Sequence, residues 1–242
     1  MDRIRVLVAA AGRGTRAGLP YPKTLYPVQG RPILLRILDL LSLYDDCPTV
    51  VVSPEGMQSI SDCLNQQGNA AHLVVQDQPR GMGDAVLAFL RSPGCPDAEH
   101  VLLTWGDIPL IQAETVAALV ACHMRDGNDF TMATRHVDAA YTLVERDAHG
   151  DVAGVRESRE AGITLPGPGE RDIGLFVFRK QCVLDALREP DPERTGAKTG
   201  EHGFLYVIGK LAREGRRVVA LPIAHELDLV SLNALSDLDG YV

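Results

Sequence analysis

Residues 9–28 read AAAGRGTRAGLPYPKTLYPV, and this stretch decides the fold class. It begins inside an apolar run, residues 4–11, that is typical of a strand buried on both faces of a sheet. The run leads into a loop of glycines and arginines, and the lone Lys23 follows seven residues beyond Arg16. Two glycines, a hydroxyl, an arginine and a lysine are therefore expected near one strand end.

This glycine loop has the composition of a phosphate-binding turn. Gly12 and Gly14 allow close backbone approach, and backbone N–H groups at a strand end form a concave cradle for an anion. Thr15 adds a hydroxyl donor, while Arg16 and Lys23 add positive charge where a polyphosphate concentrates negative charge. The spacing matches neither a P-loop nor the dinucleotide-binding GxGxxG pattern. An ordinary strand-to-helix turn is the alternative for the glycines alone.

Outward from this loop, short β-branched runs alternate with apolar residues at helical spacing. Strands are predicted at residues 5–9, 49–53, 73–76, 100–105 and 129–134, and helices at residues 33–43, 57–66, 84–90 and 114–124. The alternation predicts an α/β fold, a Rossmann-like three-layer sandwich with a mostly parallel mixed sheet. Ligands bind such sheets at the carboxyl ends of the strands, where the glycine loop falls.

The pattern changes after residue 134. Residues 141–145 and 152–155 bracket the turn sequence AHGD and predict a β-hairpin. A loop at 162–171, a strand at 172–178, a short helix at 181–187 and a mobile loop at 189–203 are predicted to follow. We interpret residues 1–242 as a single domain with a substrate-side insertion at about residues 135–205. No hexapeptide repeat follows the α/β part, so no β-helix domain is expected.

Composition excludes several classes of function. The 242 residues are 45% hydrophobic and carry a net charge of −8, which argues against a nucleic-acid or anionic-membrane partner. Five scattered cysteines without a CxxC pair argue against a disulfide framework or a zinc site and favour a reduced, cytoplasmic location. No apolar run approaches the length of a membrane span.

Two further polar residues follow predicted strands. Asp107, in LLTWGDIPLI, stands just past a buried strand, where a carboxylate can hold Mg²⁺ together with phosphate oxygens. A turn or helix N-cap is its alternative role, and the nearby phosphate loop favours the metal. Gln76, in QDQPRGMGDAV, offers both a donor and an acceptor to the edge of a pyrimidine, and its alternative is an ordinary polar residue at a strand end.

The run from Ala10 to Arg16, followed by Pro22 and Lys23, resembles the signature of the nucleoside-diphosphate-sugar pyrophosphorylase (sugar-phosphate nucleotidyltransferase) family. Within that family the chain is most similar to the uridyltransferase domains of bacterial N-acetylglucosamine-1-phosphate uridyltransferases. Later landmarks follow in the family's order: Gln76, Gly81-Met82-Gly83, Gly106-Asp107, Glu157, Gly200-Glu201 and Asn233. The resemblance covers nearly the whole chain, is most specific over residues 6–34 and is loose beyond residue 140.

The resemblance implies roles for these positions. Arg16 and Lys23 would be catalytic, and Mg²⁺ would be held by Asp107 and Asn233, for which capping of the last helix is the alternative. The nucleotide would contact Ala10, Ala11, Gly12, Gly14, Thr15, Gln76, Gly81 and Met82.

The acceptor would contact Thr142, Glu157 and Asp172. Thr142 and Asp172 replace a glycine and an asparagine of the family pattern, and residues 202–206 also depart from it. These departures leave the acceptor undetermined. The acids Glu157 and Asp172 suggest a polyhydroxyl or amine-bearing acceptor.

The implied reaction is attack of an acceptor phosphate on the α-phosphorus of a nucleoside triphosphate, with UTP or CTP favoured and pyrophosphate released. A phosphate monoester is already an anionic nucleophile near neutral pH, so no general base is needed. Arg16 would contact the departing β- and γ-phosphates, and Lys23 the α-phosphate. Catalysis would come from positioning and charge neutralisation.

Three other functions fit parts of the pattern. A cytidylyltransferase for a non-sugar phosphate, of the phospho-amino-alcohol type, is the strongest alternative because the acceptor region diverges. A glycosyltransferase would want an Asp-x-Asp metal pair, whereas Gly106-Asp107 offers one acid. A non-catalytic nucleotide sensor would keep the loop but lose Arg16, Lys23 or Asp107. The oligomeric state is left open.

Overall fold

The computed structural model describes residues 4–12, 17–78, 80–93, 95, 97–164 and 166–241. Three residues of the predicted glycine loop, Gly14, Thr15 and Arg16, lie outside the described residues. Their predicted roles in nucleotide binding and catalysis are therefore still predictions. All the strands and helices predicted before residue 134 are present.

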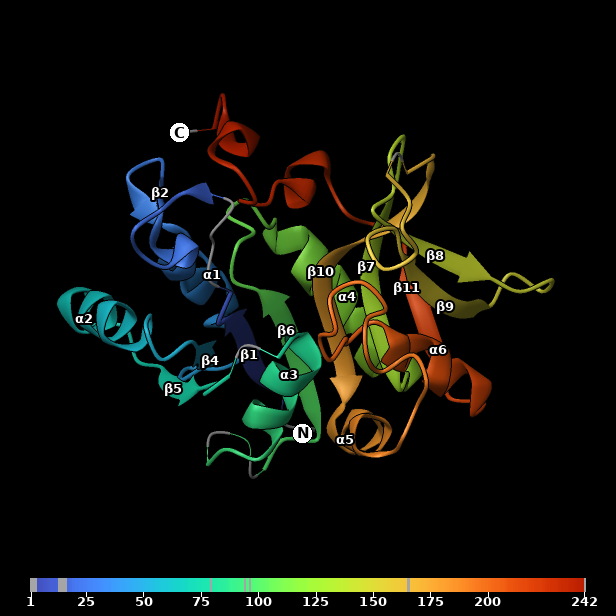
Figure 1. Cartoon of the computed structure of the whole chain (residues 1–242). Helices are drawn as coiled ribbons and strands as arrows, with labels where there is room; N and C mark the ends of the chain where they lie inside the picture. Colours follow the sequence, from blue (N-terminus) through green and yellow to red (C-terminus); the bar gives the residue numbers. More distant parts are fainter. Residues whose placement is uncertain are drawn as a thin grey trace.

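The core of the protein is a seven-stranded sheet with the strand order β11-β7-β10-β6-β1-β4-β5 (Figure 1). The strands are β1 (Ile4–Ala10), β4 (Thr49–Val52), β5 (His72–Val75), β6 (His100–Trp105), β7 (Phe130–Val137), β10 (Gly169–Arg179) and β11 (Val218–Leu221). Strand β10 is antiparallel to both of its neighbours, and the other strands run in the opposite direction to it. The predicted mostly parallel mixed sheet is confirmed.

Helices cover both faces of the sheet because successive strand residues point to opposite sides. Leu7 and Leu103 face a core built with α3 (Met82–Leu90), α5 (Lys180–Arg188) and α6 (Tyr206–Arg213). Val8 and Leu102 face a second core built with α1 (Ile33–Leu41), α2 (Met57–Gln67) and α4 (Ala113–Asp126). The two cores make the predicted three-layer sandwich.

The hairpin is formed by β8 (Thr142–Arg146) and β9 (Val152–Glu157), as predicted. Strand β10, however, begins three residues earlier than predicted. Gly169 already pairs with Val137 of β7, and the ladder continues to Asp172 before a bulge interrupts it. The region predicted as a loop therefore supplies the first residues of this strand. Residues 189–203 lack helices and strands, apart from one bridge between Thr195 and His202.

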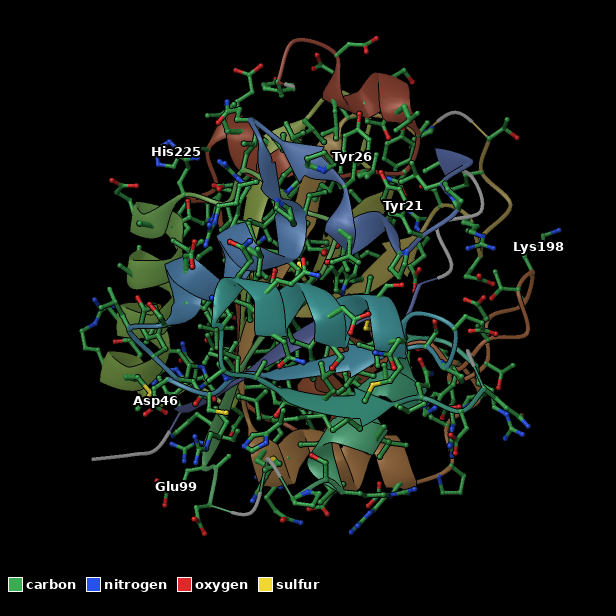
Figure 2. The ribbon with its side chains drawn as sticks, turned by 90° about the vertical axis from the view of Figure 1, so that its left-hand side faces the viewer. Tyr21, Tyr26, Asp46, Glu99, Lys198 and His225 are labelled. Atoms are coloured by element: carbon green, nitrogen blue, oxygen red, sulfur yellow. The ribbon has the colours of Figure 1, made fainter. Side chains whose placement is uncertain are left out.

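Short elements gather around the carboxyl ends of the parallel strands. They are η2 (Lys23–Leu25), β2 (Pro27–Val28), β3 (Arg31–Pro32), η3 (Glu226–Leu229) and η4 (Leu235–Leu238). Figure 2 shows Tyr21 and Tyr26, which flank η2, at the opposite end of the molecule from Glu99, which precedes β6. Lys23 is thereby placed at the edge of the sheet where β1 and β6 end.

A buried pair of histidines lies at the other edge of the sheet. Nδ1 of His100 and Nε2 of His123 are 2.9 Å apart, and Nδ1 of His123 lies 2.9 Å from the Thr131 hydroxyl. Burial, and then the neighbouring charges of His100 and Arg179, lower the pKa of His123 from 6.5 to about 4, against the opposing effect of Asp129. The folded protein therefore holds His123 neutral at pH values where the unfolded chain protonates it.

We expect this histidine to make the protein less stable as the pH falls from 6.5 towards 4. Because its folded pKa is depressed, the unfolded state binds the extra proton first, and the loss reaches about 3 kcal/mol near pH 4. Urea unfolding across this range measures the effect. His123→Gln should flatten the pH profile relative to wild type, whereas His136→Gln, at an exposed position, should not. Parallel profiles for wild type and His123→Gln would contradict the prediction.

Candidate active site

Two adjoining cavities open at the carboxyl ends of the parallel strands. The glycine-loop cavity has a volume of about 590 Å³ and is lined by residues that follow β1, β5 and β6. The hairpin cavity has a volume of about 520 Å³ and is lined by β9, by the 192–203 segment and by α6. Both are lined by the same five residues, which we call the shared wall: Met82, Trp105, Glu157, Arg159 and Glu201.

The glycine-loop cavity brings together most of the predicted site residues that the structure describes. Its lining includes Ala10, Ala11, Gly12, Lys23, Gln76, Gly81, Met82, Asp107, Glu157 and Asn233. The register of the sheet explains this convergence, because Ala9 of β1 pairs with Trp105 of β6 and the amide of Gly106 donates to the carbonyl of Ala9 at 2.9 Å. Residues on either side of this contact, Gly12 and Asp107, therefore share one cavity.

Lys23 and Asp107 form an ion pair within this cavity. The Lys23 Nζ donates to Oδ2 of Asp107 and also, at 3.2 Å, to the carbonyl of Leu232. The other carboxylate oxygen, Oδ1, is buried and has no hydrogen-bond partner among the described residues. A buried, unpaired carboxylate oxygen is costly unless it gains a ligand. A hard divalent cation fits this position, because carboxylate and amide oxygens are the ligands it prefers.

A backbone contact positions Asn233 in the glycine-loop cavity with Asp107. The amide of Leu232 donates to the carbonyl of Asp107 at 2.9 Å, which fixes the C-terminal segment beside the loop after β6. The side-chain amide of Asn233 donates to Ser231 at 3.0 Å, and its Oδ1 has no bond to the described residues. The donor set thus contains a carboxylate and an amide oxygen, which fits a magnesium ion.

Gln76 and Gly81 form the opposite side of the glycine-loop cavity. The Gln76 backbone donates to Val52 at 2.8 Å, and its side-chain Nε2 donates to the carbonyl of Gly81 at 3.0 Å. Gly81 has φ +113°, which L side chains rarely adopt, and precedes α3 as its N-cap. The close packing of α3 against His202 requires a glycine here, because a Cβ would lie 2.3 Å from the carbonyl of His202.

Gly81→Ala should destabilise the protein by about 3 kcal/mol, since it combines backbone strain with an overlap against His202. Urea unfolding at neutral pH measures this loss. Gly68→Ala is the matched control: its φ is also positive, at +69°, but nothing lies within 4 Å of the added Cβ. We expect the control to lose only about 1 kcal/mol. Equal losses in the two variants would show that the contact with His202 carries no cost.

The three predicted acceptor residues are neighbours, since Thr142 pairs with Glu157 across the hairpin and bonds to Asp172, but only Glu157 lines a cavity. Glu157 lies on the shared wall, where burial and then the charges of Asp172 and Glu160 raise its pKa. Asp172 is buried, lines neither cavity, and accepts hydrogen bonds from the Thr142 hydroxyl and from the Gly174 amide at 2.9 Å. Burial raises the pKa of Asp172. Thr142 and Asp172 thus form a pair with each other outside both cavity linings.

Three residues on the shared wall were not predicted as site residues: Trp105, Arg159 and Glu201, of which Glu201 was named only as a landmark of the family. Trp105 lies directly before Gly106 and Asp107, and its buried Nε1 donor has no partner among the described residues. Arg159 follows Glu157 by two positions, and it lines both cavities. Adjacency in sequence to a predicted site residue is the signal that could have identified Trp105 and Arg159.

His202 forms part of the hairpin cavity behind the shared wall. Its Nδ1 lies 2.8 Å from Oδ1 of Asp84, and its Nε2 lies 3.4 Å from the Tyr206 hydroxyl. Burial lowers the pKa of His202, and the hydrogen bond with Asp84 opposes this effect. The histidine therefore joins α3 to the start of α6 and stabilises the wall of the hairpin cavity.

Comparison with known proteins decides the family. Residues 6–198 match the MobA-like NTP transferase domain. The chain belongs to this family. The match includes the glycine loop, Lys23, Gln76, Asp107 and the shared-wall residues Glu157 and Arg159. The family resemblance predicted from the glycine loop and its later landmarks is confirmed.

Individual relatives agree with this assignment. The chain is 32% identical over 231 residues to the bifunctional protein GlmU of Streptomyces coelicolor, and this match covers 94% of the chain and 47% of the relative. It is 32% identical over 237 residues to the GlmU of Alkalilimnicola ehrlichii, covering 95% of the chain and 48% of the relative. The chain thus spans about half the length of the curated relatives it matches.

A solved structure shows the same fold. It is a Bacillus anthracis protein assigned as a glucose-1-phosphate thymidylyltransferase, in complex with sucrose. The TM-score is 0.76, and the superposition covers 98% of this chain and 93% of that one. Sequence identity is 15%, so this likeness supports the fold alone.

Proposed function

We propose that this protein is a Mg²⁺-dependent nucleotidyltransferase that joins a nucleoside monophosphate to a phosphorylated small molecule and releases pyrophosphate. The observation that carries the proposal is the ion pair of Lys23 with Asp107, whose second carboxylate oxygen is buried and unpaired, in the glycine-loop cavity that adjoins the hairpin cavity. One cavity is available for the triphosphate and the other for the acceptor. The family match and the GlmU relatives support the same reaction class.

Residues on both sides of the reacting phosphorus take part in the proposed mechanism. Asp107 and Asn233 would hold the magnesium ion, which when bound supplies charge neutralisation to the phosphates. Lys23 stabilises negative charge at the α-phosphate, and the backbone at Gly12 approaches the triphosphate closely. We assign Arg16 to the leaving β- and γ-phosphates. The acceptor phosphate attacks the α-phosphorus in line with the departing pyrophosphate, with Trp105 and Met82 bordering the path between the cavities.

We propose UTP or CTP as the nucleotide. Gln76 is 7% exposed and lines the glycine-loop cavity, and its Nε2 is already engaged by Gly81. Its Oε1 is then the atom left for the base, and it can accept from N3–H of uracil or from the amino group of cytosine. This acceptor fits either pyrimidine, and the choice between the two pyrimidines is left to the experiment.

A sugar 1-phosphate is the proposed acceptor, and a non-sugar phosphate, with CTP as the nucleotide, is the second candidate. The second candidate is favoured by one observation: Thr142 and Asp172 bond to each other instead of lining the cavities. The acceptor side therefore departs from the resembled pattern, while the residues around Lys23 and Asp107 keep it.

The proposed function is tested by measuring pyrophosphate release with Mg²⁺. UTP, CTP, GTP, ATP and dTTP are each combined with a panel of sugar 1-phosphates and with phosphocholine and phosphoethanolamine. Release that requires one nucleotide and one acceptor supports the proposal and names both substrates. Tight nucleotide binding with no release across the panel would instead favour a nucleotide sensor.

We also propose a cytoplasmic location. None of the five cysteines forms a disulfide. Within the part of the chain that the structure describes, no helix has the length and apolar character needed to cross a bilayer. Both observations agree with an enzyme that uses nucleoside triphosphates, which are supplied inside the cell.

A further inference from the structure

The shared wall contains one arginine, Arg159. It is exposed and lines both cavities. Its guanidinium makes no hydrogen bond or ion pair with any described residue, although its charge acts on the nearby carboxylates of Glu157 and Glu160. We propose that Arg159 binds the phosphate of the acceptor and holds it at the junction of the two cavities. This inference rests on the proposed function, because it assigns one residue to the second substrate of that reaction.

The other arginines of the hairpin cavity are already paired. Arg156 lies 3.2 Å from the carboxylate of Glu145, and Arg213 lies 3.1 Å from Asp191 and 3.5 Å from Glu193. Lys198, on the loop beside this cavity, points away from the body of the protein (Figure 2). Among the arginines that line the hairpin cavity, Arg159 is therefore the one whose guanidinium has no hydrogen bond or ion pair with a described residue.

The backbone that carries Arg159 is held firmly. Ser158 donates its amide to Tyr141 at 2.8 Å and its hydroxyl to Ala140 at 3.2 Å. The amide of Ile163 returns to the carbonyl of Ser158 at 2.8 Å, and that of Gly162 to the carbonyl of Arg159 at 3.3 Å. The side chain thus projects from a fixed turn directly after β9, which limits the entropy lost when it binds a ligand.

The position of Arg159 favours the acceptor phosphate over the triphosphate. The described cations that line the glycine-loop cavity are Lys23 and Arg159, and Lys23 is engaged with Asp107. An anion bound by Arg159 sits where the cavities meet, which is where an attacking phosphate must lie to reach the α-phosphorus. A guanidinium fits a phosphate with two parallel hydrogen bonds, and this geometry orients the nucleophile.

The neighbouring acids define where the phosphate can sit. Glu157 and Glu201, also on the shared wall, have carboxylates that accept no hydrogen bond from the described residues, and the charge of Arg159 acts on Glu157. Like charge excludes a phosphate from their side of the wall and leaves the guanidinium as its contact. Both carboxylates are then available to the hydroxyl or amino groups of the acceptor.

Calorimetric titration with glucose 1-phosphate and, separately, with inorganic phosphate tests the inference without nucleotide or Mg²⁺, so that no reaction occurs. Arg159→Ala should weaken binding by about tenfold or more, because a charge-assisted hydrogen-bond pair is lost. Arg159→Lys keeps the positive charge but loses the planar guanidinium that makes two parallel hydrogen bonds. Its affinity should lie between that of Arg159→Ala and that of wild type. Arg125→Ala, whose arginine is paired with Asp126 on α4 and lines neither cavity, should stay within about twofold of wild type.

Equal weakening in Arg159→Ala and Arg125→Ala, or unchanged binding in Arg159→Ala, would overturn the inference. So would a wild-type protein that binds neither ligand at millimolar concentration. In the pyrophosphate assay, Arg159→Ala should raise KM for the acceptor and leave KM for the nucleotide unchanged; an effect confined to the nucleotide would also overturn it. Absence of release by wild type across the whole panel rejects the proposed function, while the titrations still decide the role of Arg159.

Discussion

Lys23→Met should lower kcat by about 10²- to 10³-fold. This is the typical loss when one preorganised hydrogen-bond donor to the developing charge of the transition state is removed. The fold should survive, because Lys23 lies in an open cavity where water can solvate Asp107 after the lysine is removed. Pyrophosphate release at saturating substrates, with urea unfolding as the check on folding, measures both outcomes. The same variant frees Oδ2 of Asp107, so Mn²⁺ should bind the nucleotide-free protein more tightly than it binds wild type.

Lys180→Met is the charge-matched control for this variant. Lys180 donates to the carbonyl of Cys95 at 3.3 Å, and its backbone amide bonds to Glu99, at the edge of the sheet away from both cavities. We expect its kcat to equal that of wild type. If Lys23→Met has the same kcat as Lys180→Met, Lys23 has no role in the mechanism.

Asp107→Asn should reduce kcat by about 10³-fold or more, because it removes the charged ligand proposed for the metal. Unlike Lys23→Met, it should weaken Mn²⁺ binding. The opposite direction of these two binding changes separates a metal ligand from a residue that competes with the metal. Titration with Mn²⁺, followed by electron paramagnetic resonance, measures the affinity of each variant without relying on turnover.

Asp62→Asn provides the control for loss of an acid. Asp62 lies on the exposed face of α2 and accepts a hydrogen bond from Gln58 at 2.8 Å. Metal affinity and kcat should be unchanged. Normal Mn²⁺ affinity in Asp107→Asn would mean that the Asp107 carboxylate pairs with Lys23 and does not bind the metal.

The residues around Lys23 and Asp107 could be placed from the sequence because each follows a strand of a parallel sheet. The carboxyl ends of such strands meet at one edge, so Gly12, Gln76 and Asp107 converge whatever the details of packing. The acceptor side follows no such rule. The hydrogen bond between Thr142 and Asp172 depends on the pairing of β10 with β7 and on the bulge that follows Asp172. Gly174, with φ +74°, is a local signal for this bulge, because an isolated glycine inside a strand often marks one, but it does not predict which side chains the bulge brings together.

Helix α6 and strand β11 show why part of the fold could not be predicted. Helix α6 has Gly209 at its centre and the β-branched Val207 and Ile208 beside it, all poor helix formers. It forms because six of its eight residues are buried, and Gly209 allows close approach to Gly154 of β9. Tertiary packing thus overrides local preference. Strand β11 has four residues, as β4 and β5 do, but no α-helix follows it among the described residues, so the alternation of strands and helices does not mark it.

The contacts around Lys23 also have a consequence for how the protein folds. Lys23 is 84 residues from Asp107 and 209 residues from Leu232, yet it bonds to both. Closing such long loops costs chain entropy that local helices and neighbouring strands do not pay, so contacts of this separation form late in folding. A refolding chain should therefore regain its helical signal before it can process a nucleotide. The candidate active site is thus expected to form only when the rest of the fold is complete.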